Sequence, residues 1–146
     1  MEVRLLEGGK HEDARGGLRF CNDFDLTSVK RFYTISNSSE HPQRGWIMHK
    51  REKKWFFPLR GKTEVKVEGR EKVDSREEIV ERNLDSTFST SSLLSKTYTL
   101  DAEHPQVLCV PPGNWFLIEQ DGTAEVQVFS NCFVGEFPND DFRKEI

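Results

Sequence analysis

A histidine lies between two tryptophans in the segment from Arg44 to Gly61, which reads RGWIMHKREKKWFFPLRG. Side chains alternate between the two faces of a strand, so a strand here turns Ile47 and His49 to the same side. Histidine acts as a base near neutral pH because modest changes of environment carry its pKa across the physiological range. The segment therefore predicts either a catalytic histidine in an aromatic-lined pocket, or a histidine that is hydrogen-bonded in the core or half exposed at a rim.

Short strands separated by turns must position this histidine. Beside the strand at His49, strands are predicted at Met1–Leu6, Leu18–Phe20, Val29–Ser36, Trp55–Leu59, Thr63–Val67, Lys96–Leu100, Val107–Val110, Trp115–Gln120 and Thr123–Phe129. The strand at His49 and the next two are predicted to form a β-meander. Strands of this length, with Gly and Pro turns between them, indicate an all-β antiparallel sandwich or barrel. At 146 residues, a single domain over residues 1–146 is expected.

Three other segments are predicted to form turns, a short helix and a linker. Glu7–Gly17 contains paired glycines and is predicted as turns. Ser75–Glu81 has the pattern of a short helix with Ser75 as its N-cap. Ser86–Ser95 is rich in Ser and Thr and is predicted to be a linker.

Charge and cysteine content limit the possible functions. The net charge is −4 and basic residues are interspersed with acidic ones, which argues against a nucleic-acid partner. Three cysteines without a CxxC pair argue against a disulfide framework or a structural zinc site. With no signal-peptide pattern and no long apolar run, we expect a soluble cytoplasmic protein with no membrane segment.

Several motifs together resemble the WxcM-like sugar cupins, the group of dTDP-4-oxo-6-deoxyglucose 3,4-ketoisomerases. The resemblance covers most of residues 18–143 and rests on Lys30-Arg-Phe-Tyr-Thr-Ile, Arg44-Gly-Trp-Ile-Met-His-Lys, Gly61, Val110-Pro-Pro-Gly-Asn-Trp115, Ser130-Asn-Cys-Phe-Val-Gly-Glu and Asp141-Phe-Arg143. It implies a cupin jelly roll, the double-stranded β-helix, and a homodimer whose N-terminal strand crosses to the partner. It also implies a dTDP-linked keto-sugar as ligand, used for surface polysaccharide.

The sequence departs from this family at the chemistry itself. The family's His-x-His falls on Ile47 and His49, so the first histidine is missing. A 3,4-isomerisation removes the proton on C3, alpha to the C4 carbonyl, and returns a proton at C4 through an enediol. One imidazole can move these protons if a second group polarises the carbonyl. We therefore predict His49 and Tyr33 as catalytic residues, since alternation puts Tyr33 on the same strand face as Arg31.

Four further residues are candidates for ligand binding. Arg31 and Arg44 offer guanidinium groups, and Arg44 either holds a sugar diphosphate or caps its turn. Lys54, if it points inward, needs an anionic partner such as a phosphate, Glu119 or Glu125. Trp115 either stacks on the ligand or plugs the barrel end. By contrast Trp55, on the opposite strand face from Lys54, is predicted to pack at a dimer interface.

No metal and no cofactor are predicted. The metal-ligand positions of ordinary cupins fall here on Ile47, His49, Lys54 and Phe116, of which one can ligate. Three function classes stay open. They are an isomerase or epimerase of a dTDP-4-keto-6-deoxyhexose, a sugar-nucleotide-binding cupin that has lost catalysis and serves as a regulator or partner, and a structural or interaction domain.

Overall fold

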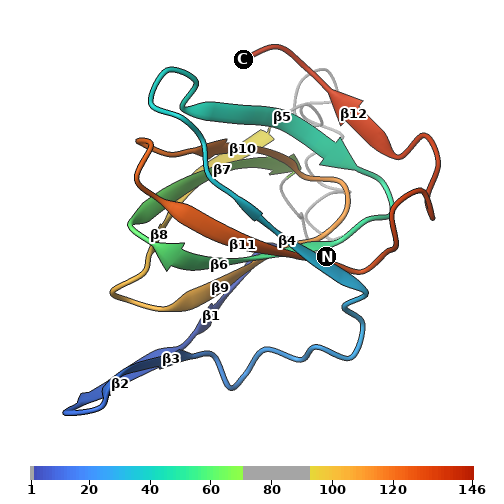
Figure 1. Ribbon diagram of the computed structural model, residues 1–146. Helices are drawn as coiled ribbons and strands as arrows, with labels where there is room; N and C mark the ends of the chain where they lie inside the picture. Colours follow the sequence, from blue (N-terminus) through green and yellow to red (C-terminus); the bar gives the residue numbers. More distant parts are fainter. Residues whose placement is uncertain (1, 71–92) are drawn as a thin grey trace, which may run out of the picture.

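Two antiparallel five-stranded sheets face each other in the computed structural model, which describes residues 2–70 and 93–146 (Figure 1). The first sheet contains, in spatial order, β1 (Arg4–Glu7), β9 (Gln106–Val110), β6 (Lys54–Arg60), β11 (Glu125–Ser130) and β4 (Arg31–Ile35). The second contains β12 (Asp141–Arg143), β5 (Gln43–His49), β10 (Trp115–Glu119), β7 (Lys62–Arg70) and β8 (Leu93–Asp101). No helix occurs in these two ranges, and none of their residues provides a helix able to cross a membrane.

From β4 to β7 the chain passes from one sheet to the other at every step, as it does again from β8 to β12. This alternation is that of a jelly roll, and it confirms the predicted all-β, cupin-type fold. The predicted β-meander is wrong, because β5 and β7 lie in the second sheet while β6 pairs with β9 and β11 in the first. Strand β6 is buried over most of its length because it lies in the middle of its sheet, between two neighbouring strands.

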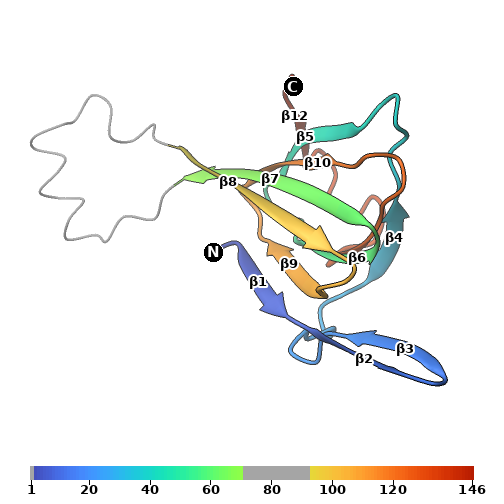
Figure 2. The same ribbon diagram turned by 90° about the vertical axis from the view of Figure 1, so that its left-hand side faces the viewer.

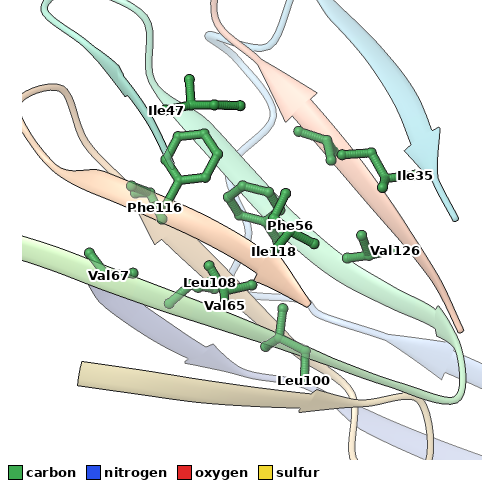
Figure 3. Close-up of a cluster of buried hydrophobic side chains, with 12 residues drawn as sticks. Ile35, Ile47, Phe56, Val65, Val67, Leu100, Leu108, Phe116, Ile118 and Val126 are labelled. Carbon is green, nitrogen blue, oxygen red and sulfur yellow. The ribbon is translucent and has the colours of Figure 1, made fainter. Parts of the chain in front are cut away.

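The core fills the space between the sheets. Alternate residues of strands β4 to β11 point into it, including Phe56 from β6, Val65 from β7 and Val126 from β11, all of them fully buried. At one end of this cluster Ile47 lies beside its cross-strand neighbour Phe116, and Leu100 lies at the other (Figure 3). The position where the resembling family has its first histidine is therefore part of the hydrophobic core.

A second hydrophobic cluster covers the outer face of the first sheet. Trp55 packs there with Val107 and Cys109, and the segment after β3 places Phe24 over it, with ring centroids 5.7 Å apart. The prediction that Trp55 packs at a dimer interface is wrong, since its side chain is 4% exposed within one chain. Residues of the same chain cover Trp55 on the outer face of the sheet. Strand alternation predicts which face a side chain points to, but not what will cover that face.

The N-terminal region is more regular than expected. Residues predicted as turns form a hairpin of β2 (Gly9–Asp13) and β3 (Gly16–Phe20), which projects from the body of the sandwich (Figure 2). The Arg19 guanidinium fixes it by donating to the carbonyl oxygens of Leu59 and Ala102. The helix predicted at 75–81 lies outside the described residues, as does the linker at 86–95 except for its last three residues, which belong to β8. That residues 1–146 form one domain stays a prediction.

Candidate active site

The corner before His49 depends on a glycine. Gly45 has a φ of 128°, and a Cβ at this position would lie 2.6 Å from the carbonyl oxygen of Phe116. An L side chain is strained at such a φ, and here it would also collide with the backbone of β10. The register between β5 and β10 shifts at this point, between Phe116 and Leu117. Gly45 thus allows β5 to lie against β10 while its inward residues face the sandwich interior.

A cavity of about 560 Å³ opens at this end of the sandwich. Residues from both sheets and from the C-terminal segment line it: Arg31, Tyr33, Thr34, Ile35, Ser36, Arg44, Ile47, His49, Glu52, Lys54, Phe116, Ile118, Phe137, Asn139, Asp140, Asp141 and Arg143. Its volume falls within the range of pockets that hold small ligands. The wall is apolar on the side of the core and carries charged groups elsewhere.

His49 lines this cavity, and its two ring nitrogens have different surroundings. Its side chain is 7% exposed, and Nδ1 lies 3.2 Å from the backbone carbonyl oxygen of Asp140. Nε2 is buried and has no hydrogen-bond partner among the described residues. With the hydrogen on Nδ1 donated to the carbonyl, the lone pair of Nε2 is free to take a proton.

Burial and the nearby ammonium of Lys54 lower the pKa of His49 below its ordinary value, although Glu52 partly offsets them. The imidazole is therefore neutral at pH 7, as a general base must be. The other three histidines, His11, His41 and His104, are exposed. Among the four, His49 is the buried one, as the strand alternation predicts.

Glu52 lies at the centre of a charged cluster in the wall of the cavity. Its Oε2 accepts hydrogen bonds from Ser130 Oγ at 2.7 Å and from Arg31 Nη2 at 3.2 Å, and it lies 3.6 Å from Lys54 Nζ. Burial alone would raise the pKa of Glu52, but the charge of Lys54, the hydrogen bond from Ser130 and the charges of His49 and Arg31 outweigh it, so the pKa is lowered. The carboxylate is ionised at neutral pH and balances the cations around it.

Lys54 points inward, and its Nζ donates a 2.7 Å hydrogen bond to Tyr33 Oη. The prediction that Glu119 or Glu125 is the anionic partner of Lys54 is wrong, because these glutamates pair instead with Lys66 and Arg60. Both glutamates lie toward the far ends of their strands, whereas Glu52 follows His49 by three residues in the connection to β6. Lys54 therefore has its counter-ion within the local segment.

The C-terminal segment closes the site from the side of β5. Strand β12 lies beside β5 (Figure 1), and the register of their pairing places Asp141 opposite His49. The carboxylate of Asp140, 6% exposed, accepts hydrogen bonds from the backbone amides of Lys50, Arg51 and Glu52 at 2.9 to 3.0 Å. One buried aspartate therefore holds the connection that follows His49.

Five of the six predicted site residues, namely Arg31, Tyr33, Arg44, His49 and Lys54, line the same cavity. Trp115 does not. It lies on the opposite face of β10 from the inward Phe116, where Lys144 Nζ sits 4.8 Å from its ring centroid. Trp115 is therefore not positioned to stack on a ligand in this cavity. Trp115 directly precedes the inward-facing Phe116 in the same strand, so strand alternation already predicts that the two side chains point to opposite faces.

Sequence reasoning missed Glu52, Asp140 and Arg143. Glu52 follows the predicted base His49 by three residues, and this closeness in sequence could have pointed to it. The charged residues around it, however, are equally typical of an exposed turn. Asp140 and Arg143 reach the cavity only through the pairing of β12 with β5, which joins residues about ninety positions apart in the sequence. No local pattern predicts that contact.

The donor atoms of His49, Glu52 and Asp140 lie within 4.8 Å of one another, a spacing that can suit a metal ion. The surrounding charges oppose one. Lys54 and Arg31 both lie against Glu52, and three backbone amides already use the Asp140 carboxylate. A cation here would face two positive side chains and would have to displace those amides. The absence of a metal stays a prediction.

No family model and no curated protein matches the chain. Solved structures do share its fold. A 3,4-ketoisomerase from Helicobacter canadensis is 18% identical, with a TM-score of 0.66 over 99% of this chain and 92% of that one. QdtA, a sugar 3,4-ketoisomerase from Thermoanaerobacterium thermosaccharolyticum in complex with TDP, is 19% identical, with a TM-score of 0.64 over 97% and 88%.

ChmJ, a 3'-monoepimerase from Streptomyces bikiniensis in complex with dTDP, is 14% identical, with a TM-score of 0.68 over 97% of this chain and 68% of that one. At these identities the likeness establishes the fold. The chain thus has the β-fold of cupin-like dTDP-sugar isomerases and epimerases.

Proposed function

We propose that this protein is an isomerase or epimerase that moves protons alpha to the carbonyl of a dTDP-linked 4-keto-6-deoxyhexose. The observation that carries the proposal is that His49 lines a cavity of about 560 Å³ and keeps a buried Nε2 without a hydrogen-bond partner among the described residues. A general base needs a free lone pair, a neutral ring and room for a substrate, and His49 combines these three. The fold shared with dTDP-sugar isomerases and an epimerase supports the choice of substrate class.

In this proposal the cavity holds the sugar against His49. Nε2 takes the proton on C3, and the Tyr33 phenol polarises the C4 carbonyl oxygen, so that an enediol forms. Returning the proton at C4 completes an isomerisation, whereas returning one to the other face of C3 gives an epimer. Arg44 and Arg143 line the same cavity and supply guanidinium groups suited to the diphosphate.

A non-catalytic sugar-nucleotide-binding cupin, acting as a regulator or partner of such an enzyme, is the alternative. The observation that favours it is Ile47, which is 8% exposed and packs in the core where the resembling family carries a histidine. This alternative keeps the nucleotide-binding arginines and predicts no proton exchange.

Exchange of the carbon-bound sugar protons with solvent distinguishes the proposed enzyme from the non-catalytic alternative. The protein is mixed with dTDP-4-oxo-6-deoxyglucose in deuterated water, and deuterium at C3 and C4 is followed by NMR. We expect the wild type to exchange, and His49→Asn to lower the rate by about 10²–10⁴, the usual contribution of a general base. Binding of dTDP, read as a rise in melting temperature, should survive in His49→Asn. Binding without exchange in the wild type would favour the non-catalytic alternative, and no binding would exclude both.

The proposal includes a C2 homodimer. Phe32 lies on the outer face of the edge strand β4 and is 66% exposed, and Leu26 in the connection before β4 is 54% exposed. An apolar surface at a sheet edge is commonly covered by a second copy. Light scattering should give about twice the chain mass of 17.0 kDa, and a single-chain mass at micromolar concentration would exclude the dimer. The cytoplasmic location and the role in surface-polysaccharide synthesis also belong to this proposal.

A further inference from the structure

Lys54 and Tyr33 form a buried pair in the wall of the cavity. The Nζ of Lys54 lies 2.7 Å from Tyr33 Oη, and both residues line the cavity that His49 faces. An ammonium group has donors and no acceptor, so the phenol oxygen is the acceptor of this bond. The hydrogen of the phenol is therefore not used by Lys54, and it is available to a ligand oxygen in the cavity.

Glu52 holds Lys54 in this position. Its Oε2 lies 3.6 Å from Lys54 Nζ, while its Oε1 lies 3.8 Å from His49 Nδ1. A buried ammonium is costly without a counter-ion, and Glu52, which is 9% exposed, supplies one. The same carboxylate thus stands next to the proposed base on one side and next to the Tyr33–Lys54 pair on the other.

We propose that Lys54 is the positioning residue that enables Tyr33 to give and take the protons of the substrate oxygens, so that the site works without a second histidine. This inference rests on the proposed function and assigns Lys54 a role other than binding phosphate. A phenol alone is a weak acid toward a ketone oxygen. An ammonium 2.7 Å away stabilises the phenolate that forms when the phenol gives up its proton.

The steps balance with two proton carriers. His49 Nε2 takes the C3 proton, the C3–H electron pair becomes the C3–C4 double bond, and the C4 oxygen takes the Tyr33 proton. The enediol then returns the O3 proton to the phenolate, the O3–H electron pair forms the C3 carbonyl, and C4 takes the proton from His49. Both side chains end as they began, and the sugar has exchanged a 4-keto for a 3-keto group. Lys54 keeps its protons throughout.

Double-variant kinetics test this role. We compare Lys54→Met, Tyr33→Phe and the double variant for conversion of dTDP-4-oxo-6-deoxyglucose to its 3-oxo isomer, and we measure dTDP affinity by calorimetry. We expect Lys54→Met to lower kcat by about 10²-fold, with KM and the Kd for dTDP changed less than about twofold. In the Tyr33→Phe background, Lys54→Met should lower kcat by less than about twofold more, because Lys54 acts through the phenol.

Lys53→Met is the matched control. Lys53 is the neighbouring lysine, and its Nζ lies 5.0 Å from the Trp55 ring on the outer face of the sheet. Its loss should leave kcat within about twofold of wild type. Lys54→Gln, which keeps a hydrogen-bond donor toward Tyr33 without the charge, serves as a second variant if Lys54→Met does not fold. We expect it to show the same loss of kcat and the same coupling to Tyr33.

Three results would overturn the inference, and they are distinguishable. Independent losses that multiply in the double variant would show that Lys54 does not act through Tyr33. A tenfold rise in the Kd for dTDP with unchanged kcat would show that Lys54 binds phosphate. Either result leaves the proposed function standing. Wild-type protein that neither converts nor exchanges the sugar would overturn the proposed function and this inference with it.

Discussion

The backbone carbonyl oxygen of Asp140 lies 3.2 Å from Nδ1 of His49 and fixes the tautomer of the imidazole, although the two residues are 91 positions apart. A carbonyl can only accept, so Nδ1 must carry the hydrogen and Nε2 the lone pair. The carboxylate of the same residue accepts from three successive backbone amides, those of Lys50, Arg51 and Glu52. Asp140 therefore orients the base and holds the connection that carries Glu52.

Asp140→Ala should both destabilise the protein and impair the site. It leaves three backbone donors without their acceptor, and we expect a loss of about 3 kcal/mol in the free energy of unfolding, measured with urea. The displaced connection should also lower proton exchange by about tenfold or more. The control is Asp141→Ala, whose side chain is 53% exposed and pairs with Arg143. It should cost less than about 0.5 kcal/mol, and equal costs for the two variants would contradict the role of Asp140.

The pH dependence of exchange should show a base whose pKa lies below that of a free histidine. Burial and Lys54 lower the pKa of His49 from its ordinary 6.5, and the neutral ring is the active form. The value of kcat/KM should therefore rise with pH through a midpoint below 6.5 and be level at pH 7. His104→Asn, a change at an exposed histidine, should leave the curve in place. A midpoint above 6.5 would show that the acid limb belongs to another group.

The sequence predicted the inward face of β4 because Arg31, Tyr33 and Ile35 alternate with exposed Phe32 and Thr34. Period-two alternation is a local property, and it was enough to predict which residues of β4 point inward. The sheet pairing is not local. Nothing in the sequence near His49 indicates that β12 will lie beside β5, so Asp140 could not be assigned to the site.

The jelly-roll crossing also explains the wrong β-meander. Strands β6 and β7 follow each other after a single residue, Gly61, which is what a hairpin would show, yet they lie in different sheets. Their alternating patterns are compatible with either arrangement. The resemblance to sugar cupins, rather than strand spacing, was the information that predicted the correct fold.

Glu52 should make stability depend on pH in the acidic range. Its pKa in the folded protein lies below the ordinary 4.5, because the surrounding cations and the Ser130 hydrogen bond outweigh burial. The unfolded chain therefore takes up the proton first as pH falls, and the stabilisation from Glu52 is complete above about 4.5 and lost below it. Glu52→Gln should cost about 3–5 kcal/mol at pH 7, since it leaves buried cations without their counter-ion.

Urea unfolding at pH 7, 5 and 4 measures this effect. The difference between wild type and Glu52→Gln should shrink as the pH falls from 5 toward 4. Glu103→Gln is the control, because Glu103 is 77% exposed and pairs with Lys10 at the surface. A difference between wild type and Glu52→Gln that stays constant across the three pH values would contradict the lowered pKa of Glu52.

The aromatic cluster on the outer sheet provides the last prediction. Phe24 contacts Trp55 and Phe129, with ring centroids 5.7 and 5.1 Å away, and so shields Trp55 within one chain. Phe24→Ala should expose the indole, shift its fluorescence to longer wavelength and cost about 2 kcal/mol of stability, below the value for a fully buried ring because Phe24 is half-buried. Trp55→Phe identifies the contribution of this indole to the spectrum. Leu18→Ala is the control, because Leu18 is 61% exposed on the projecting hairpin and should cost less than about 0.5 kcal/mol. If Phe24→Ala leaves the emission of Trp55 unchanged, then the segment that carries Phe24 does not shield that face.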